Sequence, residues 1–90
     1  MTGAATEARH ILSSVVGDDL VASLGDDDQL FSRGVIDSLQ LVEIIERFQG
    51  DLGIEVGGED LSPENFGSIA GMARFLEQKR ARGGSGPGNG

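Results

Sequence analysis

The sequence contains no cysteine, no tryptophan and no tyrosine. Without cysteine, the chain forms no disulfide, no thiolate metal site and no cysteine nucleophile. Four phenylalanines are its only aromatic residues, so the core must consist mainly of leucine, isoleucine and valine. A 90-residue chain without disulfides fits the cytoplasm, which is the localisation that we expect.

Basic residues and long apolar runs are also scarce. Seven Lys and Arg stand against fifteen Asp and Glu, and the net charge is −8 at pH 7. Nucleic-acid binding needs clustered basic side chains and is not expected. No apolar stretch approaches the ~20 residues that span a bilayer, and the N-terminus lacks the pattern of a signal peptide, so we expect no membrane partner. So acidic a surface favours partners with basic docking surfaces.

Ninety residues allow a single domain, and apolar periodicity predicts that its first element is a helix. Thr6 is the predicted N-cap, and Gly17 lies near the predicted end, after which apolar residues can resume the periodicity. In the polar loop that follows, Leu30 and Phe31 are expected to anchor the chain to the core. The residues of the apolar stripe are Ala8, Ile11, Leu12, Val15 and Val16.

The clearest helical pattern begins at Ser38, and Gly53 is its expected C-cap. Pro63 limits a short third helix, and Ser68 is expected to cap the last one. We therefore predict an all-α four-helix bundle with a long first loop over residues 1–82, followed by a flexible glycine-rich tail, 83–90. The core stripe of the helix after Ser38 is Leu41, Ile44, Ile45, Phe48 and Leu52.

Ser38 deserves separate consideration because it starts this helix directly after an acid, in the run Gly34-Val35-Ile36-Asp37-Ser38-Leu39. A hydroxyl there stands at the positive end of a helix, where an attached anion is stabilised. The simpler interpretation is a helix N-cap, which contributes about 1 kcal/mol. The tripeptide Asp-Ser-Leu alone favours the cap.

The wider pattern changes that balance. The run from Gly34 to Leu39 and the helix after it, together with Gly53-Ile54-Glu55-Val56 and Pro63-Glu64-Asn65-Phe66, resemble the carrier-protein family of acyl and peptidyl carrier proteins. The resemblance spans about residues 8–80, in the same order and spacing. It implies a four-helix bundle that is not an enzyme.

The resemblance also implies a cofactor and partners. Ser38 would receive 4′-phosphopantetheine from coenzyme A through a separate phosphopantetheinyl transferase, and the thiol would then hold an acyl or aminoacyl group as a thioester for biosynthetic enzymes. The acid that matches Asp37 helps to bind the transferase's metal ion in the family, and Gly34 allows the tight approach of the loop. Leu39 begins the exposed face of the helix.

The outer face of this helix is the predicted docking surface. Leu39, Val42, Glu43 and Glu46 point away from the core stripe, and residues 37–65 contain eight acids and one base. Apolar residues rimmed by acids suit a basic partner, although exposed charges are equally explained by solvation. Gln40 and Glu46 depart from fatty-acid carriers, and Asp-Ser-Leu departs from the His-Ser-Leu of modular peptide synthetases. We expect a freestanding, monomeric carrier of a specialised pathway. The sequence leaves open whether its cargo is a fatty-acid, polyketide or aminoacyl group.

Two other functional classes remain as alternatives. The first is an unmodified helical interaction module that docks a basic partner through its acidic face. The second is an enzyme with Ser38 as nucleophile, which lacks support because His10 is the only histidine and no oxyanion hole is indicated. Asp26, Asp27 and Asp28 do not have EF-hand spacing, so no metal site is expected.

Overall fold

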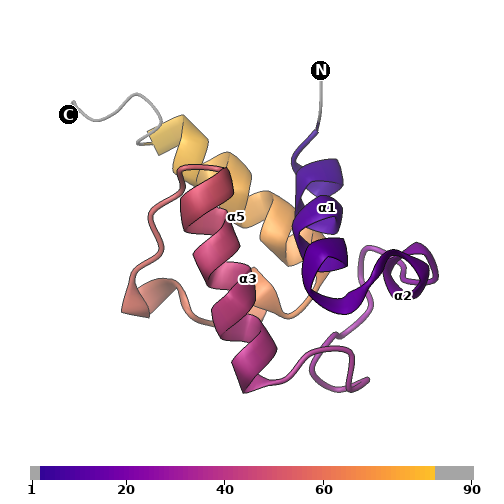
Figure 1. The fold of residues 1–90 in the computed structure, drawn as a ribbon. Coiled ribbons are helices and arrows are strands. Elements are labelled where there is room, and N and C mark those ends of the chain that lie inside the picture. The colour runs from indigo at the N-terminus through magenta and orange to yellow at the C-terminus, as the bar shows by residue number, and fades with distance from the viewer. Residues whose placement is uncertain (1–2, 83–90) are drawn as a thin grey trace.

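A computed structural model describes residues 3–82 of the chain, which are helical without strands over that range (Figure 1). The all-α prediction is confirmed, whereas the predicted glycine-rich tail at 83–90 lies outside the described residues. The elements are α1 (Ala4–Val16), α2 (Asp18–Ala22), α3 (Ser38–Asp51), the 3₁₀ turn η1 (Gly58–Asp60), α4 (Pro63–Phe66) and α5 (Ile69–Arg82).

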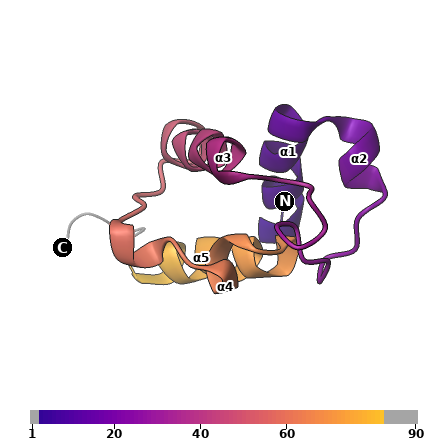
Figure 2. The same ribbon diagram turned by 90° about the horizontal axis from the view of Figure 1, so that it is seen from below.

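Helix α1 is the centre of the arrangement, because it packs against α5, α2 and α3. It runs antiparallel to α3, so the end of α1 lies nearer the start of α3 in space (Figure 1). Figure 2 shows α3 across from α4 and α5, with α2 on the outer side of α1. The start of α3 is therefore held at one end of the molecule by the long loop that leads to it.

Three phenyl rings form the middle of the core. The centroids of Phe48 on α3 and Phe66 on α4 lie 5.6 Å apart, and Phe75 on α5 lies 5.2 Å from Phe66 and 6.4 Å from Phe48. Rings at such distances add attraction to their area of burial. Around them, ten of the fifteen buried apolar residues in the described range are Leu, Ile or Val, as composition predicted.

The ends of α1 differ in part from the prediction. Gly3 is the N-cap, and Thr6 lies exposed within the helix, so the predicted Thr6 cap is wrong. The helix starts a turn earlier because Ala4 also packs against the core. Gly17 ends the helix with φ 106°, a conformation that glycine adopts readily, and α2 follows at once.

The long loop is anchored by Leu30 rather than by Leu30 and Phe31 together. Leu30 is fully buried and its N–H donates to the carbonyl of Gly67 at 2.8 Å. Phe31 is 40% exposed, so its predicted anchoring role is wrong. The two residues are adjacent at a turn and point different ways, so only one of them reaches the core.

Arg9 ties this loop to α1. Its guanidinium donates to the carbonyls of Val21 at 3.1 Å and Leu24 at 2.9 Å and pairs with the carboxylate of Asp26 at 2.7 Å. The carbonyl of Asp26 in turn accepts from the N–H of Ala70 at 2.8 Å. The acidic loop therefore has fixed contacts to both the first and the last helix.

The predicted caps of the later helices are mostly confirmed. Ser68 accepts a hydrogen bond from the N–H of Gly71 at 3.0 Å at the start of α5. Pro63 occupies the first turn of α4, with Ser62 as cap, so it begins this helix instead of limiting it. The C-cap of α3 is Leu52, one residue before the predicted Gly53, which follows with φ 67° as helix ends favour.

Candidate site on the exposed start of helix α3

Ser38 is the first residue of α3, but it is not the cap. Asp37 is the N-cap: its carboxylate accepts from the N–H of Gln40 at 2.9 Å, and the side-chain oxygen of Gln40 accepts from the N–H of Asp37 at 3.1 Å. This reciprocal pair is a capping box. The interpretation of Ser38 as the N-cap is therefore wrong, because Asp37 caps the helix.

The Ser38 hydroxyl is left available. It is exposed, and among residues 3–82 no group forms a hydrogen bond with it. In the same range, the backbone N–H groups of Ser38 and Leu39 have no acceptor, as expected for a helix start. A hydroxyl beside free N–H groups at the positive end of a helix is a favourable place for a phosphodiester.

The loop before α3 explains why the serine is held outward. Gly34 has φ 74°, the left-handed conformation that glycine favours, and the N–H of Val35 donates to the carbonyl of Leu30 at 2.8 Å. Ile36 is buried at 3% exposure. With Ile36 held in the core, Asp37 and Ser38 project from the edge of the bundle and stay exposed.

The structure exposes the four residues of the predicted docking surface. Leu39 is 72% exposed and Val42 is 50% exposed, while Glu43 and Glu46 are exposed beside them. The leucine and valine are the more informative pair, since so large an exposed fraction leaves their apolar surface in water. The structure thus makes these side chains accessible, and their role in partner binding stays a prediction.

The acidic side chains of α3 differ from other acids of the protein because they form no ion pair within the described residues. The four ion pairs within the described residues are Arg9–Asp26, Arg33–Asp28, Lys79–Asp60 and Arg80–Glu7, and none of them involves an acid of α3. The Glu7 carboxylate, by accepting a hydrogen bond from Arg80, raises the pKa of that guanidinium. The acids of α3 are consequently free of ion pairs over residues 3–82.

Sequence reasoning missed two exposed apolar residues, Leu20, which is 39% exposed, and Leu61. Leu61 follows η1 and is 49% exposed. The ion pair between Asp60 and Lys79, at 3.0 Å, connects the residue before it to α5. The neighbours of Leu61 in the sequence, Asp60 and Ser62, are polar, and this is the sequence feature that distinguishes Leu61 from a core residue.

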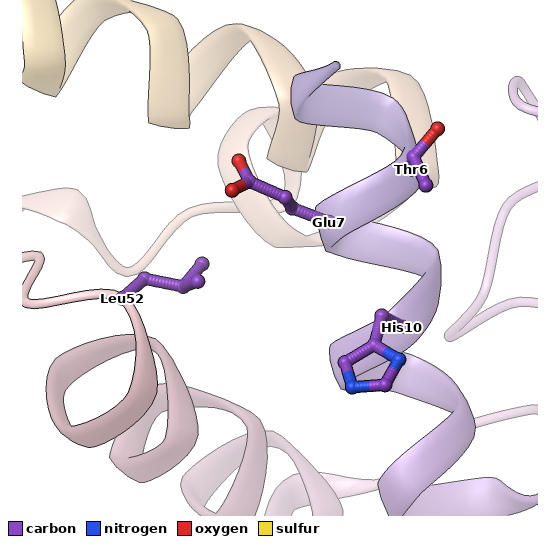
Figure 3. A pocket seen from close by; sticks show the side chains of 4 residues that line it. All are labelled: Thr6, Glu7, His10 and Leu52. Carbon is purple, nitrogen blue, oxygen red and sulfur yellow. The ribbon is translucent and has the colours of Figure 1, made fainter. Parts of the chain in front are cut away.

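A pocket lies at the opposite end of α3. Thr6, Glu7 and His10 of α1 and Leu52 at the C-cap of α3 line a space of about 390 Å³ (Figure 3). His10 is exposed on α1. Within residues 3–82 no three His, Cys, Asp or Glu side chains gather as metal ligands would.

These features define a class of protein: a small helical domain that presents an exposed serine at the start of a helix whose outer face is apolar and acidic. Residues 7–76 match the family described as phosphopantetheine attachment site. The chain is also 37% identical over 68 residues to the D-alanyl carrier protein of Enterococcus faecalis (strain ATCC 700802 / V583). The matched region covers 76% of this chain and 86% of that protein. The chain belongs to the phosphopantetheine-binding carrier-protein family.

Family membership confirms several predictions. The protein is a non-catalytic carrier that uses 4′-phosphopantetheine covalently attached to a serine, and its partners include a phosphopantetheinyl transferase and biosynthetic enzymes. The expected bundle of the acyl-carrier type is confirmed as well. In the part of the chain that the structure describes, no helix combines the length and apolar character needed to cross a membrane.

Proposed function

We propose that Ser38 is the serine that carries the phosphopantetheine, and that the loaded cargo is an amino acid, D-alanine, held as a thioester. The exposed Ser38 hydroxyl, without a hydrogen-bond partner among the described residues, is the observation that carries the first part. The printed name of the Enterococcus relative supports the second part. Among the cargoes predicted from the sequence, this favours the aminoacyl class over fatty-acid and polyketide groups.

The attachment reaction makes one bond and breaks one. The Ser38 Oγ attacks the phosphorus atom that bears the pantetheine of coenzyme A, a P–O bond of the pyrophosphate breaks, and 3′,5′-ADP leaves while the hydroxyl proton passes to the transferase. One oxygen of Asp37 caps α3, and the other accepts no hydrogen bond within residues 3–82. That second oxygen can contribute to the transferase's metal site, the role proposed for Asp37.

The interior of the bundle supports a small cargo. Phe48, Phe66 and Phe75 are at most 2% exposed and pack against one another between α3, α4 and α5. Inserting a long acyl chain there would have to displace close-packed rings, which costs free energy. A D-alanyl group needs no such space, since its ammonium group prefers water or a charged partner.

The docking surface proposed for partners is Leu39, Val42, Glu43 and Glu46. Its apolar pair supplies contact area, and its acids, which lack ion pairs among the described residues, attract basic partner surfaces. We propose that the carrier acts as a monomer in the cytoplasm, which its cysteine-free composition and acidic surface support.

The test of attachment is intact-mass measurement after incubation with coenzyme A and a promiscuous phosphopantetheinyl transferase. We expect the mass of one phosphopantetheine to be added to the wild type and to Ser32→Ala, which removes another exposed serine, but not to Ser38→Ala. Modification of Ser38→Ala would place the attachment on another serine. No addition to the wild type, while a control carrier is modified, would support the unmodified interaction module instead.

The test of cargo follows on the modified protein. With ATP and a ligase that activates D-alanine, we expect the mass of one D-alanyl group to be added and then removed by hydroxylamine, which cleaves thioesters. The same protein is offered a fatty acid with an acyl ligase in parallel. Loading of the fatty acid but not of D-alanine would overturn the aminoacyl proposal and leave attachment at Ser38 intact.

A further inference from the structure

The pocket at the far end of α3 lies on the same flank of that helix as Ser38. Ser38, Ile45 and Leu52 follow one another at intervals of seven residues, which is close to two turns of an α-helix, so they share one flank. This flank is the margin of the core stripe, where Ile45 and Leu52 pack against the core but stay partly exposed. Leu52 lines the pocket together with residues of α1. The end of this flank, at Leu52, therefore lies next to α1.

The cofactor is slightly shorter than this flank. From Ser38 to Leu52 the helix rises roughly 21 Å at its ordinary rise per residue. A phosphopantetheine arm is an extended chain with two amide groups, and with about 3.5 Å for every three bonds it spans about 17 Å. An arm laid along the flank would place its sulfur about 4 Å short of Leu52, and the aminoacyl group beyond the sulfur would reach the pocket.

The charge of the pocket suits an aminoacyl cargo. Glu7 and Leu52 point toward each other across the opening, with His10 one turn further along α1 (Figure 3). One oxygen of Glu7 pairs with Arg80, and the other has no hydrogen-bond partner among residues 3–82. The Glu7 carboxylate is half-buried, so salt screens it less than an exposed one. An ammonium group entering the pocket would meet this oxygen, and a methyl group would meet Leu52.

We infer that the loaded arm rests along this flank of α3, with the aminoacyl thioester in the pocket formed by Thr6, Glu7, His10 and Leu52. The inference rests on the proposed attachment at Ser38 and adds a resting place for the cargo outside the phenylalanine core. Partners that dock on Leu39, Val42 and the acids beside them then draw the cargo out from a neighbouring flank.

His10 gives a direct measurement of this contact. It is the only histidine, so its imidazole protons give an isolated NMR signal. We expect the His10 and Leu52 side-chain signals to shift when phosphopantetheine is attached and to shift again when D-alanine is loaded, with smaller shifts at Leu61. If mass spectrometry shows full loading while both signals stay in place, the resting place is wrong. If no arm is attached at Ser38, the proposed function itself fails.

A pair of variants tests the role of the carboxylate. Glu7→Gln removes the charge that would meet the ammonium group, and Arg80→Ala breaks the same ion pair but keeps the carboxylate. We expect the shift of His10 on D-alanine loading to be lost in Glu7→Gln and retained in Arg80→Ala, while the shift on arm attachment remains in both. Loss of the loading shift in both variants, or in neither, would overturn the assignment of Glu7.

Discussion

Asp37 and Gln40 cap helix α3 reciprocally, each accepting a hydrogen bond from the backbone N–H of the other at 2.9 and 3.1 Å. This relationship gives a reason for Gln40, which stands where many fatty-acid carriers have an acid. The amide oxygen closes the capping box without adding a further negative charge beside the phosphodiester proposed on Ser38. Asp37 can therefore hold the helix end and still offer one oxygen outward.

Two substitutions at Asp37 separate these roles. Asp37→Ala removes the cap and should destabilise the protein by about 1 kcal/mol, a fall of about 4–8 °C in Tm for a domain of this size. Asp37→Asn keeps a good cap, so its Tm should stay near the wild-type value. Its rate of phosphopantetheinylation should nevertheless fall about tenfold or more, as expected when a carboxylate beside a metal is lost. If Asp37→Asn and the wild type are phosphopantetheinylated at equal rates, Asp37 caps the helix but has no role in the transferase's metal site.

The proposed docking surface is tested by reversing two of its charges. Glu43→Lys with Glu46→Lys should slow D-alanine loading about tenfold at low salt, because steering toward a basic partner is lost, and the difference should shrink as salt is added. Glu55→Lys with Glu77→Lys makes the same change in net charge at exposed positions elsewhere. Circular dichroism checks that both pairs remain helical. If the control pair slows loading equally, total charge rather than this face governs the encounter.

The crossing of α4 and α5 depends on Gly71. A Cβ at this position would lie 2.1 Å from the carbonyl oxygen of Glu64, a backbone atom, so the helices must move apart. We expect Gly71→Ala to lower the free energy of unfolding by about 1–3 kcal/mol.

Gly50 in α3 is the matched control for that substitution. Nothing lies within 4 Å of a Cβ built there, so Gly50→Ala should instead raise stability by about 0.5–1 kcal/mol through a better helix propensity. Urea unfolding measures both variants. The same sign of change at Gly50 and Gly71 would contradict the close approach of α4 and α5.

Arg9 offers a prediction about the long loop. Arg9→Ala removes the charged donor from the carbonyls of Val21 and Leu24, although the Val21 carbonyl keeps the N–H of Leu24 at 3.0 Å. We expect a cost of about 2 kcal/mol, since hydrogen bonds to charged groups are the stronger ones. Asp26→Asn weakens only the half-exposed ion pair and should cost at most about 1 kcal/mol. Urea unfolding at constant m-value gives both quantities. Should Asp26→Asn cost as much as Arg9→Ala, the ion pair and not the carbonyl contacts would dominate.

Much of the fold follows from sequence patterns because those patterns are local. The stripe of Ile44 and Phe48 predicted α3 within two residues of its observed end, and Ser68 was recognised as a cap. The errors lie where two neighbouring residues compete for one role: Asp37 rather than Ser38 caps α3, and Leu30 rather than Phe31 enters the core. Propensity ranks Asp and Ser alike as caps, so only the backbone geometry distinguishes them.

By itself, the sequence determined the helical class, the acidic surface and the resemblance that singles out Ser38, because composition, periodicity and motif spacing need no long-range contact. Only the tertiary structure decided that the Ser38 hydroxyl is free of hydrogen bonds within the described residues, and that α1 meets the end of α3 at a pocket on the same flank. These facts depend on how Arg9, Leu30 and Gly67 fix the loop and helices against one another, and contacts between distant residues leave no periodic trace in the chain.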